Sequence, residues 1–246
     1  MKDRIKKSYK ILSEEGFFVF FLIVTSRFIF LENKIARRIL KIPTINRIVW
    51  HIYRPLVKNL VIILSYIKPD KYVREDPFKL HWVDPQKIEY KTIPPENFHL
   101  GIKWGRKTDE ELEKITEPKE NINALKKFVN GCSWENSGLK DTDMQQEHIN
   151  KYNRTNRERK EILESMIESM KEEGYKTQKE LYYKNPRETV KQNNDRVFPP
   201  LNEINVAMDK EGTLLRRKGH HRLNVAKILG IPKVPVLIQF RHKKLS

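Results

Sequence analysis

The apolar residues in the second half of the chain follow two different periods. Between residues 161 and 173 they recur at spacings of one, three and four, which places them on one face of a helix. We therefore predict a helix over Glu161–Glu173 and a shorter one over Arg222–Leu229. Residues 205–208 alternate as a half-buried strand does, and Val234–Ile238 is a second short apolar run. We predict that these two segments are strands of one sheet.

The segments around these elements are less regular. Leu80–Ile88 predicts a short strand, a turn at Asp84-Pro85 and a returning strand. Residues 94 to about 157 are polar and are expected to form a long irregular insertion with one short helix at Asn123–Asn130. Lys184–Pro200 is polar and ends on two prolines, which is typical of a loop. Helices and strands therefore mix along the chain, and we predict an α+β fold with a small mixed sheet.

The first third of the chain is apolar in short runs and basic between them. Gly16–Ser26 holds 11 uncharged residues in a row, and Arg27 then interrupts the apolar sequence. A bilayer-spanning helix needs about 20 mostly apolar residues, so neither this run nor Asn59–Ile67 is long enough. We predict two or three helices over residues 1–74. Their predicted apolar surface includes Phe17, Phe18, Phe21 and Val24.

Two interpretations of residues 1–74 stay open. In the first, apolar helix faces lie in the interface of an anionic membrane, with Lys and Arg beside the headgroups. This would place a cytoplasmic protein at the inner membrane face. In the second, the helices form a hairpin whose apolar faces are buried against the rest of the protein. The basic positions that would form two cationic stripes are Lys34, Arg37, Arg38, Lys41, Arg47, Arg54 and Lys58.

The distribution of charge separates two regions. The 246 residues include 49 Lys and Arg against 32 Asp and Glu, a formal net charge of +17. Residues 1–74 hold 16 of the basic and 5 of the acidic residues, so +11 of that charge lies there. We divide the chain into a basic helical region over 1–76 and an α+β domain over 77–246. The excess implies an anionic partner: a nucleotide, a nucleic acid or anionic lipid. The single cysteine, Cys132, excludes an internal disulfide framework.

One short segment suggests chemistry: Gly219-His220-His221-Arg222, between a predicted strand and a predicted helix. Glycine lets the backbone approach a ligand closely, and a helix start presents unpaired N–H groups and a positive dipole end. Phosphate is the anion that such a site favours, and Arg222 can bind it bidentately. His220 and His221 can donate hydrogen bonds, or one of them can transfer a proton near neutral pH. A motif this short is equally compatible with an exposed turn.

Residues 203–241 resemble the second half of a ParB/sulfiredoxin-like domain. The shared pattern is a strand, a tight turn, a strand ending in Gly-x-x-Arg, a helix with small residues, Leu-Gly and a Val-Pro-Val strand. Its counterparts here are Gly219-His220-His221-Arg222, Ala226, Leu229-Gly230 and Val234-Pro235-Val236. The first half is similar through Val83-Asp84-Pro85, Ile88 and the helix over Leu163–Gly174. The resemblance covers about residues 80–95 and 160–242, and residues 1–76 lie outside it.

The resemblance implies that this loop holds the phosphates of ATP, ADP or CTP, and it leaves magnesium open. Gly219 would approach the phosphates, and His221 and Arg222 would contact them. His220 stands where sulfiredoxin has its reactive cysteine, which excludes sulfiredoxin chemistry. Lys218 stands where many relatives have Asp, which puts metal-assisted catalysis in doubt. The helix-turn-helix module of the partition proteins is not expected.

Two functional hypotheses follow. In the first, the protein binds a nucleotide and catalyses phosphoryl transfer or nucleotide hydrolysis, with His220, His221 and Glu168 as candidate catalytic residues. Glu168 shares a helix face with two further glutamates, and an exposed helix face is the commoner role for such residues. In the second hypothesis, the protein is a non-enzymatic nucleic-acid-binding or nuclease-like module that uses basic residues such as Arg216-Arg217-Lys218. The His positions show no spacing typical of a metal site.

Overall fold

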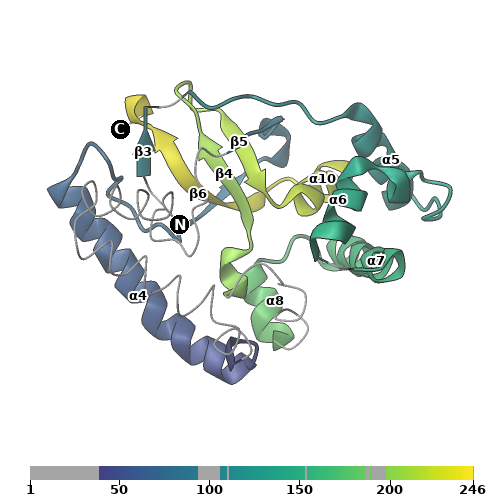
Figure 1. The fold of residues 1–246 in the computed structure, drawn as a ribbon, viewed down its shortest axis with the longest axis horizontal. Helices are drawn as coiled ribbons and strands as arrows, with labels where there is room; N and C mark the ends of the chain where they lie inside the picture. The colour runs from purple at the N-terminus through teal and green to yellow at the C-terminus, as the bar shows by residue number, and fades with distance from the viewer. Residues whose placement is uncertain are drawn as a thin grey trace, which may run out of the picture.

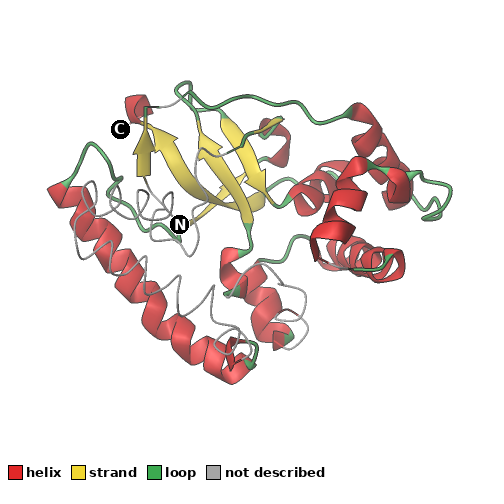
Figure 2. Ribbon diagram, in the orientation of Figure 1, coloured by secondary structure: helices red, strands yellow, loops and turns green. Residues whose placement is uncertain are grey.

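The computed structural model describes residues 39–93, 106–109, 111–152, 154–186, 189 and 198–245. It confirms an α+β fold in which one mixed sheet is flanked by helices (Figure 2). The helices are α4 (Pro43–Ile67), α5 (Lys119–Val129), α6 (Asp143–Tyr152), α7 (Asn156–Glu173), α8 (Gln178–Lys184) and α10 (His220–Ile228). The strands are β1 (Leu80–Val83), β2 (Tyr90–Lys91), β3 (Arg106–Thr108), β4 (Ile204–Met208), β5 (Leu214–Lys218) and β6 (Val234–His242).

The long strand β6 organises the sheet. The strand order is β1-β6-β4-β5-β2, and β3 also pairs with β6. β6 is antiparallel to β1 and parallel to β4 and β3, and β4 and β5 form an antiparallel hairpin. Val206 of β4 lies opposite Ile238 of β6, which confirms that the two predicted strands belong to one sheet. Because β5 leads directly into α10, the hairpin sets the position of that helix.

The two faces of β6 are covered by different helices, because successive side chains of a strand point to opposite faces. Val236 and Ile238 lie in one cluster with Leu223 and Ala226 of α10. Leu237 lies in a second cluster, with the buried side of α4. Figure 1 shows α4 along one side of the molecule, with α5, α6, α7 and α10 grouped at the other end. The sheet is therefore buried on both faces.

Helix α4 is part of this core. Its Trp50 packs edge-on against Phe78, with ring centroids 5.5 Å apart, and lies 5.0 Å from the ring of Phe198. The buried side of α4 thus fits the second interpretation of the N-terminal region, while residues 1–38, with the predicted Phe-rich surface, lie outside the described residues. In the part of the chain that the structure describes, α4 is the one helix long and apolar enough to cross a membrane. This is weak support for a membrane span, because core helices pass the same test.

The stretch 94–157 is more ordered than its polar composition predicts. The expected short helix is confirmed as α5, and α6 follows it. Leu125 and Phe128 of α5 pack with Trp134 and with Leu163 of α7, so an apolar stripe on α5 is enough to order the segment. The sequence reading of this segment as largely irregular is wrong for residues 119–152, since few but well-spaced apolar residues suffice to build a small core.

Other boundaries also differ from the predictions. The predicted helix over Glu161–Glu173 begins earlier, at Asn156, because Thr155 and Glu158 form a capping box. The strand after the Asp84-Pro85 turn does not return alongside β1. Instead β2 pairs in parallel with β5, and the buried Ile88 just before it packs in one cluster with Val206 of β4 and Leu223 of α10. The predicted loop over Lys184–Pro200 lies largely outside the described residues.

Candidate functional site at the start of helix α10

Gly219 joins β5 to α10 in a conformation that requires glycine. Its φ is +86°, in the left-handed region. A Cβ atom here would lie 2.9 Å from the Cα of Ile204 in β4, so both the backbone angle and the close approach exclude other residues. The start of α10 has no side-chain cap and no acidic residue in its first turn. Its positive end is therefore not neutralised by the helix itself.

His220, His221 and Arg222 follow one another in this first turn, so their side chains point in three directions about 100° apart. Each of them enters a different group of polar residues. These three groups come from segments that are distant in the sequence.

The first group is centred on Glu117, in the extended segment before α5. Its Oε1 lies 2.6 Å from Nδ1 of His220 and also contacts the Arg216 guanidinium, while its Oε2 accepts a hydrogen bond of 2.9 Å from Asn224. Burial opposes ionisation of Glu117, but His220, Arg216 and Asn224 together lower its pKa to about 2. Glu117 is thus a buried carboxylate that stays ionised.

This contact also fixes the state of His220. Burial lowers the pKa of its imidazole, against the opposing attraction of Glu117. The neutral ring donates its Nδ1–H to the Glu117 carboxylate, which leaves Nε2 as a lone-pair acceptor. The pair has the form of a carboxylate that orients a histidine general base.

The second group surrounds His221. Its Nε2 lies 2.8 Å from a guanidinium nitrogen of Arg159 and 3.0 Å from Nε2 of Gln145. Arg159 in turn donates a hydrogen bond of 2.8 Å to Oε1 of Gln145, and both residues are buried. Because a guanidinium can only donate, Nε2 of His221 is the acceptor and its ring proton lies on Nδ1.

The third group holds Arg222. Its guanidinium donates to the backbone carbonyl of Asn202 and lies 3.8 Å from Oε2 of Glu203. Glu203 also accepts a hydrogen bond of 3.2 Å from the hydroxyl of Tyr175. Burial raises the pKa of Glu203 to about 7, although the charge of Arg222 opposes the shift. The resemblance implied that Arg222 and His221 contact the same phosphates. In this structure the Arg222 guanidinium is instead turned toward Asn202 and Glu203.

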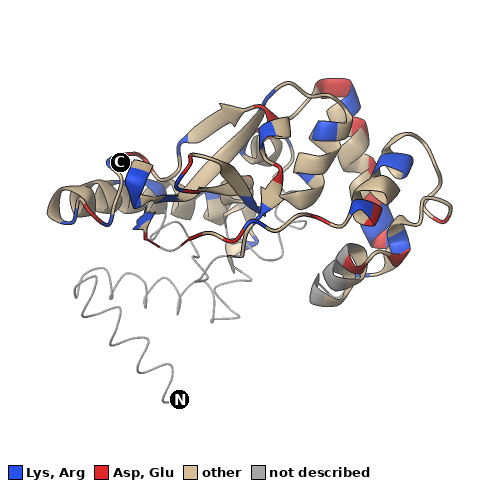
Figure 3. Cartoon of the chain, turned by 90° about the horizontal axis from the view of Figure 1, so that it is seen from above, with Lys and Arg blue, Asp and Glu red and all other residues tan. Residues whose placement is uncertain are grey.

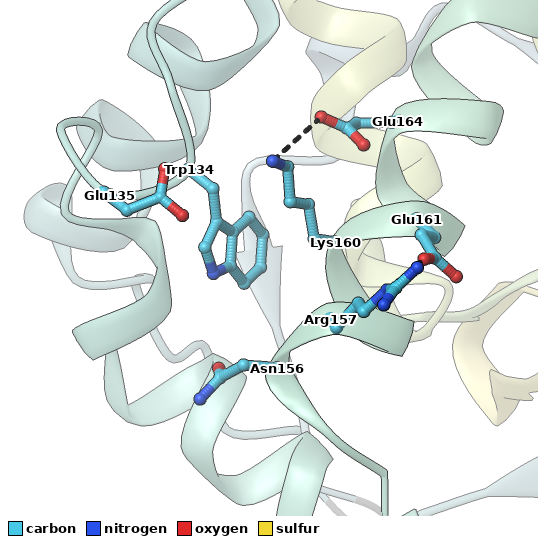
Figure 4. A pocket seen from close by; sticks show the side chains of 7 residues that line it. All are labelled: Trp134, Glu135, Asn156, Arg157, Lys160, Glu161 and Glu164. Atoms are coloured by element: carbon cyan, nitrogen blue, oxygen red, sulfur yellow. Dashed lines mark hydrogen bonds and ion pairs between the residues drawn. The ribbon is translucent and has the colours of Figure 1, made fainter.

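Glu168, the third catalytic candidate from the sequence, lies away from this turn. It is exposed on α7, on the side opposite the buried Leu163 and Ile167. Glu164, one turn earlier on α7, lines a separate cleft of about 420 Å³ together with Trp134, and Lys160 lies 3.9 Å from Glu164 there (Figure 4). The sequence spacing placed Glu168 on one helix face with two further glutamates, and in the structure Glu168 is exposed to solvent.

The basic run before Gly219 is largely engaged inside the protein. Arg216 is bound to Glu117, and Arg217 donates to Gln239 and stacks over the ring of Phe240 at 4.8 Å. Figure 3 shows Asp and Glu positions interspersed among the Lys and Arg positions of the described chain. Arg216 and Arg217 are therefore held by contacts within the protein and do not form an exposed basic surface before Gly219.

Sequence reasoning identified the turn but missed the residues around it. They are Glu117, Gln145, Arg159, Tyr175, Glu203 and Asn224. Glu117 is 103 residues from His220 and Arg159 is 62 residues from His221, so no local spacing could have linked them. Among the described residues, no group of three His, Cys, Asp or Glu could hold a metal ion.

Comparisons of the chain with models of protein families, with curated proteins and with solved structures gave no match.

Proposed function

We propose that the protein binds a nucleotide through its phosphate groups at the first turn of α10, in a domain of the ParB/sulfiredoxin-like type. The observation that carries the proposal is the uncapped start of α10, which Gly219 brings against β4 and which has no acidic residue in its first turn. Backbone N–H groups and the helix dipole at such a start favour an anion with several oxygens.

The charges around the turn support the same ligand. Three guanidinium groups, those of Arg159, Arg216 and Arg222, lie around the turn, one in each of its three polar groups. Among the described residues, the carboxylates that oppose them include Glu117 and Glu203, and Glu203 has a pKa of about 7. Arg222 can therefore exchange a weakly held carboxylate for a phosphate, which is doubly charged near neutral pH and accepts a bidentate hydrogen bond.

The Glu117–His220 pair supports phosphoryl transfer or hydrolysis at this site. Nε2 of His220 would accept the proton of an attacking water or hydroxyl group as its oxygen bonds to the terminal phosphorus. The bond from phosphorus to the bridging oxygen would break at the same time, and the nucleotide would leave with that electron pair. Glu117 would stabilise the imidazolium that forms. Magnesium, where it takes part, would arrive on the nucleotide phosphates.

A thermal-shift panel tests the proposal: adenosine, AMP, ADP, ATP and CTP, each with and without magnesium. We expect stabilisation to rise with the number of phosphates, reaching about 2.7 kcal/mol at a ligand concentration of 100 times the dissociation constant. Gly219→Val should abolish the effect through backbone crowding, and Arg157→Ala, which removes an exposed arginine elsewhere on α7, should leave it intact. The absence of any nucleotide-dependent shift would refute the proposal.

The nucleic-acid hypothesis predicts a different result. Binding of an oligonucleotide would depend on dispersed Lys and Arg rather than on Gly219, and it would fall steeply with salt. Oligonucleotide binding that survives Gly219→Val, without any response to mononucleotides, would favour that alternative.

A further inference from the structure

Helix α4 has a second apolar face, opposite the one that it buries against the sheet. The residues of this outer face, between 54% and 67% exposed, are Ile48, Ile52, Leu56, Ile63, Tyr66 and Ile67. Their spacing places them on one side of the helix, and the buried Tyr53, Val57 and Leu64 lie on the other. The exposed Asn59 lies on the same side, between Leu56 and Ile63, and the apolar residues around it form a surface of the kind that marks an interaction site in soluble proteins.

The charged residues of α4 itself are all basic, and two of them, Arg54 and Lys58, form ion pairs with Asp76 on the flank of the helix. Residues 39–69 hold five Lys and Arg and no Asp or Glu. Arg54 and Lys58 follow the flank of the helix between its two apolar faces, and each side chain is more than 40% exposed although both approach Asp76. At the C-terminal end of the helix, the guanidinium of Arg74 lies 3.9 Å from the centroid of the Tyr66 ring.

We propose that the outer face of α4 binds the surface of an anionic lipid bilayer. Aliphatic side chains with almost no hydrogen-bonding groups suit the acyl-chain boundary, and a basic flank suits the anionic headgroups beside it. Tyrosine and arginine at one end of the helix match the polar edge of the bilayer. This inference is independent of the proposed nucleotide site.

The helix would lie in the plane of the membrane surface. Its inner face is held by the sheet and by aromatic residues, since Trp50 contacts both Phe78 and Phe198. A transmembrane position would require α4 to leave this core and to expose Val61, which is fully buried. An in-plane helix needs no such rearrangement and leaves the start of α10 in solution.

The test is flotation of the full-length protein with vesicles of phosphatidylcholine alone and with vesicles containing phosphatidylglycerol. The variant Ile52→Asp/Ile63→Asp alters the outer face. The matched control, Ile93→Asp/Leu245→Asp, makes the same chemical change at two exposed apolar residues outside α4. Circular dichroism and thermal unfolding establish that each variant is folded, and Ile52→Ser/Ile63→Ser provides a milder replacement if the aspartates perturb the helix.

We expect the wild type to bind anionic vesicles and the outer-face variant to bind them about tenfold more weakly, because two apolar anchors are lost and two negative charges are gained. The control should stay within about twofold of the wild type. Equal flotation of the wild type and the outer-face variant would overturn the proposal, as would a wild type that binds no vesicles. Light scattering that shows a wild-type dimer and a monomeric variant, with unchanged vesicle binding, would instead assign the face to contacts between two copies.

Discussion

Replacing Glu117 with Gln tests whether this carboxylate holds the start of α10 in place. The substitution keeps the size and one acceptor oxygen of the side chain, but removes its charge. Arg216 and His220 then lose their shared anion inside the protein, where the side chains of both Glu117 and Arg216 are only 10% exposed. The loss of free energy should therefore be much larger than for a surface ion pair.

Two routes give the size of the effect. Removal of one partner from a buried ion pair costs about 3–5 kcal/mol, because the remaining charge is left without compensation. The pKa of Glu117 provides a second route: it falls from 4.5 to about 2 in the folded protein, and each unit is worth about 1.4 kcal/mol. We expect Glu117→Gln to lower the free energy of unfolding by about 3 kcal/mol near neutral pH.

Urea unfolding of both proteins as a function of pH measures this. Because the folded-state pKa is lowered, the stabilisation is present above 4.5 and is lost as the pH falls toward 2. The gap between wild type and variant should thus shrink by about 2 kcal/mol between about pH 5 and about pH 3. Glu164→Gln, which breaks an exposed pair with Lys160 at 3.9 Å, is the control and should cost less than about 0.5 kcal/mol. A Glu117→Gln variant as stable as this control, or a gap that widens in acid, would refute the reasoning.

Three further predictions concern the fold. Trp50→Ala should cost about 3–5 kcal/mol in chemical unfolding because α4 belongs to the main core, and a loss below about 1 kcal/mol would mean that this helix folds separately. Gly219→Ala should destabilise the protein more than Gly230→Ala, since both have positive φ but only Gly219 meets backbone atoms; equal urea midpoints would contradict this. The raised pKa of Glu203 makes its ionisation costly in the folded protein, so the wild type should lose about 3 kcal/mol of stability as pH rises from 4.5 to about 7. Glu203→Gln should not show this loss, and a variant whose stability falls with pH as the wild type's does would contradict the assignment.

The elements that sequence patterns predicted well are those with strong local signals. Helix α7 has a regular apolar period, and Gly219 and Gly230 bracket α10 closely. The short helix α5 was predicted, but the order of the residues around it was underestimated because apolar residues such as Leu125 and Phe128 are few among many polar ones. Whether they form a core depends on Leu163 of α7, which is far away in the sequence.

The pairing of β2 with β5 was beyond the reach of sequence patterns for a similar reason. A two-residue strand carries almost no periodicity, and its partner is more than 100 residues away.

In the candidate site too, residues that are adjacent in the sequence were predicted and residues that are far apart in the sequence were not. The glycine and the three residues after it were identified from their order alone. Their partners were not, because Glu117, Arg159 and Glu203 come from three separate segments that only the folded chain brings together. The direction of Arg222 also depends on the fold, since the nearby Asn202 carbonyl competes for its guanidinium.

Calorimetric titration of ATP, ADP and CTP into the wild type and Arg222→Ala tests the nucleotide proposal most directly. Arg157→Ala serves as the control for loss of a positive charge. We expect the wild type to bind at least one of these nucleotides and Arg222→Ala to bind it more weakly by about 1.5–3 kcal/mol, the usual worth of a hydrogen bond to a charged group. The control should bind as the wild type does. If the wild type binds none of the three nucleotides, or if Arg222→Ala binds as tightly as the wild type, the start of α10 is not a phosphate site.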